Sequence, residues 1–462
     1  MVVMTTGEHS DASDEPGDRG VARPHAAPGS PGTPGGSDAV RQLHPTRSPG
    51  RGGGAPGSPG RPSRDRRAWL FIAFAVFSVA WGGNEFTPLL VFYRGEDVFS
   101  PLFVDSLMAA YACGIGAGLM LAGPLSDRYG RRVVMLPAPV VAVLGSSLIA
   151  AGETSEIPMF LGRVCAGLAV GAAMSAGGSW IKELSTPAFD PSAGPGAGAK
   201  RATMSLTAGF GLGAGVAGVL AQWGPIPGQL PYFLHIAVSV VALLGLLTVP
   251  ETRQSAHLRV AGSFWTDLRV PSARHPRFLT VVLPVAPWVF GAAGVSYAIM
   301  PTLASGVVGA PVAFSALLAV VALASGYSIQ QVGPQLNSAT SARGPLLGLG
   351  LVIVGMVVAS LSARHITVWN TVVVAVILGA AYGLCLISGL TEVQRIAGPD
   401  DLGGLTAVYY VVTYIGFFFP MILTKLGDWF TYPVMLGFGV VMAVLAFIVV
   451  AVNSRRHLPA AD

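Results

Sequence analysis

The sequence predicts an all-α membrane protein with twelve transmembrane helices, arranged as two six-helix bundles. Of its 462 residues, 52% are hydrophobic and only 11% are charged, whereas about 25% of the residues in a soluble protein are charged. From residue 68 onward, long apolar runs alternate with short polar loops, and each run approaches the ~20 residues that a helix needs to cross the hydrocarbon. A polar stretch at 251–278 separates the first six runs from the last six.

The twelve predicted spans contain glycine and proline, which membrane helices tolerate. They cover residues 68–92, 102–122, 133–152, 157–181, 202–222, 231–250, 279–303, 311–332, 346–362, 367–390, 404–424 and 432–452. Residues 67–250 should form the N-terminal six-helix bundle and residues 279–452 the C-terminal six-helix bundle. Between them, 251–278 should be a cytoplasmic linker, and 453–462 a cytoplasmic tail.

The N-terminal segment differs in composition from the rest. Residues 1–67 contain 13 Gly and 10 Pro, so no part of this segment can bury enough apolar surface to order itself. We expect a disordered tail over residues 1–66. It lacks an apolar stretch near Met1 and is therefore not a signal peptide. A regulatory role for the tail is the less favoured alternative.

Lysine and arginine mark the side of the membrane on which each loop lies. The loops on the side of the two termini hold 19 of these residues when 61–67 are included, and the other side holds 3. This difference predicts a multi-pass protein of the plasma membrane with both termini in the cytoplasm. Because the basic residues are spread over short loops, they favour a lipid bilayer over a nucleic acid as the partner.

The loop between the second and third spans carries the most specific motif. It contains a glycine, a spaced acid, a basic residue, a second glycine and two more basic residues: Gly123, Asp127, Arg128, Gly130, Arg131 and Arg132. At these positions the chain resembles the major facilitator superfamily of transporters. The resemblance implies two repeats that work by alternating access. It also implies that Asp127 faces the start of the eleventh helix, near Gly404, as part of a cytoplasmic gate.

Two charged residues close the tenth span on the same side. Glu392 either pairs locally with Arg395 or reaches across the halves to Arg128 or Arg131. We assign Glu392 and Arg395 to the cytoplasmic gate rather than to a substrate site.

Charges inside the spans are costly and mark functional sites by default. The spans hold Glu85, Asp105 and Arg163. We expect Glu85 to carry a proton and Arg163 to modulate its proton affinity; in the resembling family, an arginine of helix four is linked to proton coupling in antiporters. A static ion pair is the structural alternative. Asp105 is expected to be a solvated carboxylate at a helix start, and His235 an interfacial histidine.

The first span is expected to be kinked. Two glycines and a proline surround the polar pair Asn84 and Glu85 in the segment 81–88, which indicates a loosened helix beside a cavity. We expect Trp81, Asn84, Glu85 and Tyr409 to line the substrate cavity.

Two further features bear on the family. The fifth span is rich in glycine, which lets membrane helices approach closely; its members are Gly209, Gly211, Gly213, Gly215 and Gly218. Drug–proton antiporters of the family carry a Gly-Pro signature in this helix, and here Val216 follows Gly215. The sequence Pro250-Glu251-Thr252 resembles the Pro-Glu-Thr found after helix six in many members.

These features predict a secondary active transporter of a small organic molecule, monomeric and similar to drug and metabolite exporters, with proton-coupled efflux favoured. The alternatives are a proton-coupled importer of a nutrient or metabolite and a non-transporting membrane sensor or receptor. The sequence lacks a phosphate-binding loop and a His-Glu-x-x-His metal site. We therefore expect no enzyme activity, no cofactor and no metal.

Overall fold

The computed structural model describes residues 67–253, 268–398, 401–456 and 458. The chain divides into the units 1–60 and 61–462, and every described residue belongs to the second. The predicted disordered tail, residues 254–267 of the predicted linker and residues 459–462 of the predicted tail lie outside the described residues.

The first half of the described chain is built from helices that run back and forth. They are α1 (Ala68–Asn84), α2 (Phe86–Gly95), α3 (Pro101–Tyr129), α4 (Arg131–Met135), α5 (Pro137–Ala151), α6 (Glu156–Ala172), α7 (Gly178–Leu184), α8 (Ala197–Trp223) and α9 (Leu230–Leu246). A π-helical turn, η2 (Ala173–Gly177), joins α6 to α7 without interrupting the span.

The second half repeats this plan. Its α-helices are α11 (Leu283–Gly294), α12 (Met300–Ala304), α13 (Pro311–Leu336), α14 (Arg343–Ser362), α15 (Val368–Ile396), α16 (Leu402–Tyr414), α17 (Phe419–Leu426) and α18 (Tyr432–Asn453). Short 3₁₀ and π segments precede or connect them: η4 (Pro271–Arg274), η5 (Phe278–Val282), η6 (Val295–Ile299), η7 (Ser305–Val307) and η8 (Ile415–Phe418).

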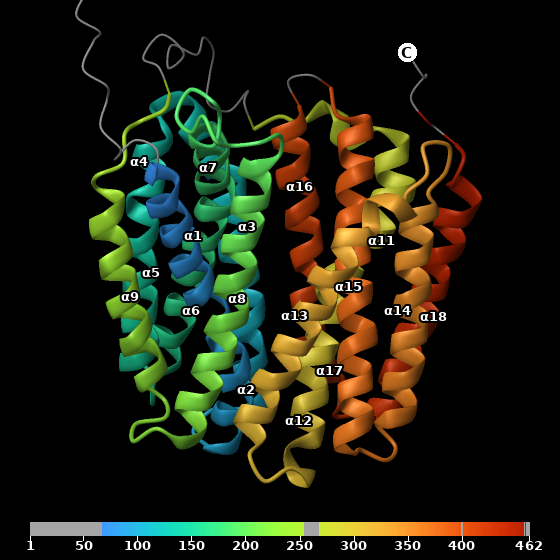
Figure 1. Cartoon of the computed structure of the whole chain (residues 1–462). Coiled ribbons are helices and arrows are strands. Elements are labelled where there is room, and N and C mark those ends of the chain that lie inside the picture. Colours follow the sequence, from blue (N-terminus) through green and yellow to red (C-terminus); the bar gives the residue numbers. More distant parts are fainter. Residues whose placement is uncertain (1–66, 254–267, 399–400, 457, 459–462) are drawn as a thin grey trace, which may run out of the picture. The chain divides into compact units, whose positions relative to one another are not determined.

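The predicted fold class is confirmed. The described residues contain eleven helical segments long and apolar enough to cross a membrane, and the shorter apolar helix α9 coincides with the remaining predicted span. The helices pack in two groups, with α3 against α6 and α1 against α8 in one, and α13 and α14 against α15 in the other. Figure 1 shows these groups as the blue-to-green and the yellow-to-red helices.

The helices alternate in direction, so the loops gather at two ends. One end holds the start of α1, the α3–α4 loop and the C-terminal end of α18; we call it the basic end because Arg128, Arg131 and Arg395 lie there. The other, which we call the opposite end, holds the α2–α3 loop and the α17–α18 loop (Figure 1).

The outer surface between the two ends is apolar. Val441, Met442 and Leu445 of α18 are 56–60% exposed. Such a surface is unfavourable in water and natural in hydrocarbon, because lipid chains solvate it as well as protein does. Within the helices most backbone groups are paired with each other, as a bilayer requires.

The first span is interrupted, as the sequence predicts. Helix α1 ends at Asn84 and α2 begins at Phe86, with Glu85 between them. Pro88 has no N–H group and cannot donate to the carbonyl of Asn84. The interruption places Glu85 at a point where the helical hydrogen bonding is locally weakened.

Glycines allow α3 and α6 to cross at close range. A Cβ atom added at Gly114 would lie 2.3 Å from the carbonyl oxygen of Val164, and one at Gly167 would lie 2.2 Å from that of Tyr111. In each case the obstacle is backbone, which a rotamer change cannot move. This crossing fixes the position of α6.

The glycines of α8 serve the same purpose only in part. Gly209 and Gly213 lie against the backbone of α1, and Gly218 lies against Ala316 of α13. Gly211, in contrast, has nothing within 4 Å of its built Cβ atom. Close approach therefore explains some of the predicted glycine pattern and not all of it.

We expect Gly167→Ala to destabilise the protein, because overpacking against backbone costs about 1–3 kcal/mol. The matched control is Gly211→Ala, which should change stability by less than about 0.5 kcal/mol. Thermal unfolding of the two purified variants in detergent, followed by tryptophan fluorescence, measures both effects. Equal unfolding temperatures for the two variants would contradict the close approach of α3 and α6.

Candidate functional site

Glu85 lies at the centre of a buried polar cluster in the first half. Its side chain is fully buried between α1 and α2. Carboxylate oxygen Oε1 accepts a hydrogen bond of 3.0 Å from the hydroxyl of Ser146 on α5. The other oxygen, Oε2, is buried and has no hydrogen-bond partner among the residues that the structure describes. A carboxylate in this position is only half satisfied.

His235 on α9 completes the cluster. Its Nδ1 atom lies 2.7 Å from Ser146 Oγ and 3.5 Å from Glu85 Oε1. Its Nε2 atom lies 3.0 Å from the carbonyl oxygen of Ser78 and 2.9 Å from Ser239 Oγ. The hydroxyl oxygens of Ser78 and Ser239 are 2.7 Å apart. One continuous chain of polar contacts thus joins α1, α5 and α9.

The prediction that His235 is an interfacial histidine is wrong. The side chain is fully buried and faces α1. Gly82 makes the room for it, since a Cβ atom at this position would lie 2.3 Å from Cε1 of the imidazole. The position of a residue near the start of a span does not reveal which way its side chain points.

Arg163 on α6 lies beside Glu85 but binds other groups. Its guanidinium donates to the carbonyl oxygens of Gly83 and Leu107, each at 3.4 Å. It also lies over the rings of Phe86 and Tyr111, 4.5 and 4.3 Å from their centroids. Among the described residues, the basic side chain within 4 Å of the Glu85 carboxylate is that of His235. The predicted coupling role of Glu85 and Arg163 stays a prediction.

The residues predicted to line the substrate cavity are packed in this conformation. Trp81, Asn84, Glu85 and Tyr409 are each less than a tenth exposed. The amide of Asn84 donates to the carbonyl of Phe210 at 2.9 Å, and the hydroxyl of Tyr409 donates to the carbonyl of Cys385 at 3.0 Å. Their role in substrate binding also stays a prediction.

The predicted motif at the basic end forms a network centred on Arg131. Its guanidinium donates to Glu183 at 2.8 and 3.0 Å, to Asp127 at 2.8 Å and to Ser126 at 2.7 Å. These contacts tie the end of α3 to the end of α7. Arg131 therefore pairs within its own half. Oxygen Oδ1 of Asp127 is one of its acceptors.

Glu251, from the Pro-Glu-Thr sequence, holds the turn after α3. Its carboxylate accepts from the backbone N–H groups of Arg131 and Arg132 at 3.1 and 2.8 Å, where negative charge is favourable at a helix start. Gly130 sits at φ +103°, and a Cβ atom there would lie 2.7 Å from Glu251. Only glycine fits both the backbone conformation and the contact.

Glu392 forms the corresponding network in the second half. It accepts from Arg395 at 2.8 Å, so the predicted local pairing is present, and from Arg277 at 2.6 Å. Arg277 is fully buried and also donates to the carbonyl oxygens of Ser454 and Arg456. Arg277 lies in the predicted linker 251–278 and is one of the basic residues counted on that side of the membrane. In the structure, its buried side chain instead holds the ends of two helices together.

A cavity of about 600 Å³ opens between the two halves at the basic end. The first half contributes Gly123, Asp127, Arg128 and Arg131, and the second contributes Asp401, Gly403 and Gly404. The predicted partners of the gate, Asp127 and the start of α16, thus line the same cavity. Among the described residues, no group of three His, Cys, Asp or Glu side chains suits a metal ion there or elsewhere.

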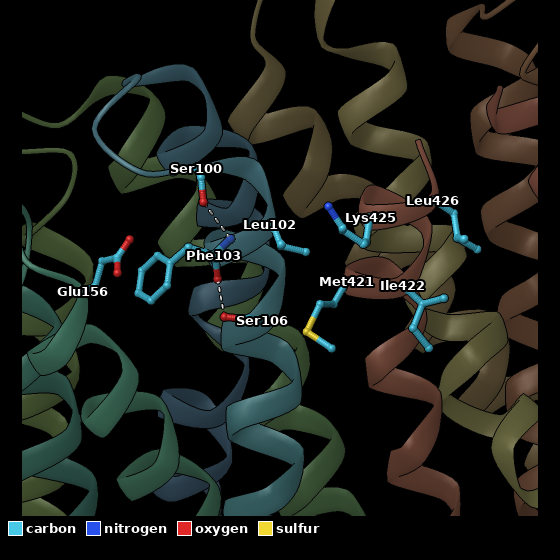
Figure 2. Close-up of a pocket in the computed structure, with 9 residues that line it drawn as sticks. All are labelled: Ser100, Leu102, Phe103, Ser106, Glu156, Met421, Ile422, Lys425 and Leu426. Atoms are coloured by element: carbon cyan, nitrogen blue, oxygen red, sulfur yellow. Dashed lines mark hydrogen bonds between the residues drawn. The ribbon is translucent and has the colours of Figure 1, made fainter. Parts of the chain in front are cut away.

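The halves meet through Asp105 at the opposite end. Arg94 and Thr424 both donate to this carboxylate, and Arg94 also donates to Thr424 at 3.0 Å. Asp105 is only 2% exposed. The prediction of a solvated carboxylate is wrong, because its partner Thr424 lies in the other half. A groove lies close by and is lined by residues of α3 and α17, together with Glu156 (Figure 2).

Sequence reasoning missed the contact of Ser78 and Ser239 with His235. A usable signal was present. Ser78 and Gly82 are four residues apart on the first span, as are His235 and Ser239 on the sixth. Residues with this spacing share one helix face. A helix face of small residues on the first span and a polar helix face on the sixth together indicate a buried contact between these two helices.

Comparison with known proteins identifies the family to which the chain is similar. Residues 70–421 match the Major Facilitator Superfamily. A chloramphenicol resistance protein of Pseudomonas aeruginosa is 26% identical over 325 residues, covering 66% of this chain and 71% of that protein. The glucose transporter GlcP of Staphylococcus epidermidis is 27% identical over 151 residues, covering 33% of this chain and 31% of that protein.

Solved structures share the fold at low sequence identity. The nucleoside transporter NupG aligns with a TM-score of 0.64 and 13% identity, covering 83% of this chain and 98% of that one. A POT family transporter in complex with 5-aminolevulinic acid aligns with a TM-score of 0.67 and 13% identity, covering 85% of this chain and 97% of that one. The chain therefore belongs to the Major Facilitator Superfamily, and it is a multi-pass membrane transporter of a small molecule.

Proposed function

We propose that the protein lies in the plasma membrane and exports small amphipathic molecules across it in exchange for protons, by alternating access. One observation supports the proposed coupling of transport to protons. Glu85 is fully buried within an interrupted span, and within the described part of the chain its Oε2 atom has no hydrogen-bond partner. A half-satisfied carboxylate at membrane depth is costly. A proton removes this cost, so Glu85 is suited to bind a proton in one state and release it in another.

The orientation follows from charge. The basic end carries most of the loop lysines and arginines, and such loops remain in the cytoplasm. We therefore place both termini in the cytoplasm. The cavity at the basic end would then open to the cytoplasm, where exported cargo enters.

Arg163 supplies a second charge to this site. It lies within electrostatic range of Glu85 and is held by backbone carbonyls rather than by a carboxylate. A small rearrangement of α6 against α1 would bring the two charges together. Such a movement would favour the ionised form of Glu85 and release its proton.

The similarity to a chloramphenicol resistance protein supports export, since it covers two thirds of the chain. Import is the alternative, supported by the shorter similarity to a glucose transporter. The similarities are to transporters, which favours transport over the sensor alternative.

The coupling proposal predicts the behaviour of Glu85→Gln. In inside-out vesicles with an acidified lumen, chloramphenicol should drive proton release by the wild-type protein, read as recovery of a pH-sensitive dye. The variant should show less than about a tenth of this flux, because its amide cannot ionise. Exchange of labelled for unlabelled chloramphenicol should persist.

Glu156→Gln is the matched control, because Glu156 is an exposed acid at the opposite end. It should release protons like the wild-type protein. Full proton release by Glu85→Gln would contradict the assignment of Glu85. Chloramphenicol exchange without proton release by the wild-type protein would contradict coupling itself.

Two polar contacts close the opposite end in this conformation. One is the cluster of Arg94, Asp105 and Thr424. In the other, Gln222 of α8 accepts from the backbone N–H groups of Val312 and Ala313 at 2.9 and 3.3 Å, and so caps α13 of the other half. Both contacts must break before this end can open. They stabilise the state in which the cavity faces the cytoplasm.

We expect Asp105→Asn to shift the protein toward opening at the opposite end. A hydrogen bond to a charged group contributes about 1.5–3 kcal/mol, so the open population should rise roughly tenfold or more. Spin labels are attached at Val98→Cys and Val307→Cys after the native cysteines are replaced by alanine. Double electron–electron resonance then measures the distance between the labels, which reports the separation of the halves.

Asp428→Asn provides the control for this measurement. Asp428 pairs with Lys425 at 3.0 Å, and both side chains are more than half exposed. Such surface pairs contribute little, so the distance distribution should stay as in the parent protein. Identical distributions for Asp105→Asn and the parent would show that the Asp105 cluster does not hold the end closed.

A further inference from the structure

The hydrogen bonds around His235 favour one of the two tautomers of its neutral imidazole. Nε2 lies 3.0 Å from the carbonyl oxygen of Ser78. A carbonyl can only accept, and an unprotonated Nε2 would face its lone pairs, so this contact favours the tautomer with the proton on Nε2. The hydroxyl of Ser239, 2.9 Å from the same nitrogen, can accept from that N–H as well. The neutral imidazole then has an unprotonated Nδ1, which can only accept. This nitrogen faces the hydroxyl of Ser146 at 2.7 Å.

In this tautomer Ser146 lies between two acceptors when Glu85 is ionised and His235 is neutral. Its hydroxyl has a single hydrogen to offer. It can donate to Glu85 Oε1 at 3.0 Å or to His235 Nδ1 at 2.7 Å, and not to both. In that state one of two short, buried contacts lacks a hydrogen. Buried polar groups left unsatisfied in this way are strongly disfavoured.

One added proton completes the chain, and it can do so in two ways. If Glu85 is protonated, it donates to Ser146 Oγ, which donates to Nδ1. If His235 is protonated, Nδ1 donates to Ser146 Oγ, which donates to Glu85. The two forms interconvert when Ser146 receives a proton from one neighbour and passes its own to the other. No atom moves by more than the length of a hydrogen bond.

We infer that Glu85 and His235 hold one transported proton jointly, with Ser146 as the link between them. This inference rests on the proposed proton coupling and adds two residues to its site. It gives His235 a reason to be buried beside an acid. It also gives Gly82 a function, because any larger residue would displace the imidazole.

The surrounding groups leave this assignment intact. Arg163 of α6 is the fixed positive charge near Glu85. Tyr111 of α3 faces Arg163, while Tyr93 of α2 and Tyr232 of α9 contact each other through their hydroxyls at 3.4 Å. Tyrosine ionises only at high pH. Within the described residues around the cluster, the carboxyl of Glu85 and the imidazole of His235 are therefore the groups that remain to exchange a proton.

Infrared difference spectroscopy against pH tests the inference on the purified full chain, without a substrate. The carboxylic C=O band absent from Glu85→Gln reports Glu85, and the imidazole bands absent from His235→Gln report His235. In the wild-type protein both sets should change at one common midpoint, because the loss of the shared proton is one macroscopic step that belongs to the pair. In Ser146→Ala they should separate by about one pH unit, a tenfold difference in proton affinity.

Ser147→Ala is the matched control, because the neighbouring hydroxyl is exposed and bonds to its own helix. It should keep the common midpoint. If Ser146→Ala does not fold, as judged by gel filtration, His235→Gln replaces it: the Glu85 band should shift by about one pH unit. His365→Gln, which alters a loop histidine, should leave that band in place.

Imidazole bands that stay constant while the Glu85 band titrates would overturn the shared proton and leave Glu85 as the sole carrier. A common midpoint that survives in Ser146→Ala would overturn the link. Absence of any titrating Glu85 band would instead overturn the proposed coupling at Glu85, together with this inference. The chloramphenicol experiment on Glu85→Gln separates these cases, because it tests coupling without reference to His235.

Discussion

A polar group at membrane depth must find its partner inside the protein, because hydrocarbon offers none. The backbone meets this constraint by forming helices. The few charged side chains meet it by gathering into clusters, each of which joins helices distant in the sequence. Glu85, Asp105 and Glu392 are the acids of three such clusters, and each is nearly or fully buried. Where these clusters lie decides which helices can separate and which cannot.

The clusters differ in what they join. Glu392 and Arg277 tie elements of the second half together, and Arg131 and Glu183 do the same in the first half. Asp105 binds a residue of the other half, Thr424, whereas the partners of Glu85 and Glu392 among the described residues lie in their own halves. Rigid halves with a breakable contact between them are what alternating access requires. The polar chemistry of the protein is thus divided between contacts that keep a half intact and contacts that hold the halves together.

The helices could be predicted from the sequence because the length of an apolar run is a local property. The loop around Asp127 could be identified because its motif is contiguous. His235 could not be placed, since its partners Ser146 and Ser78 lie 89 and 157 positions away. Asp105 was misplaced for the same reason, because Thr424 is 319 positions distant. Arg277 resembles any loop arginine until the carbonyl groups at the end of α18 are seen around it.

The contact of Gln222 with α13 links the conformation of the protein to water. The first N–H groups of a helix need acceptors from outside the helix, and Gln222 supplies one to Val312 and Ala313. When the halves separate, this acceptor is withdrawn, and only solvent entering the gap can replace it. Opening at this end is therefore a hydration event as well as a movement of helices. Osmotic stress, which withdraws water, would favour the closed arrangement.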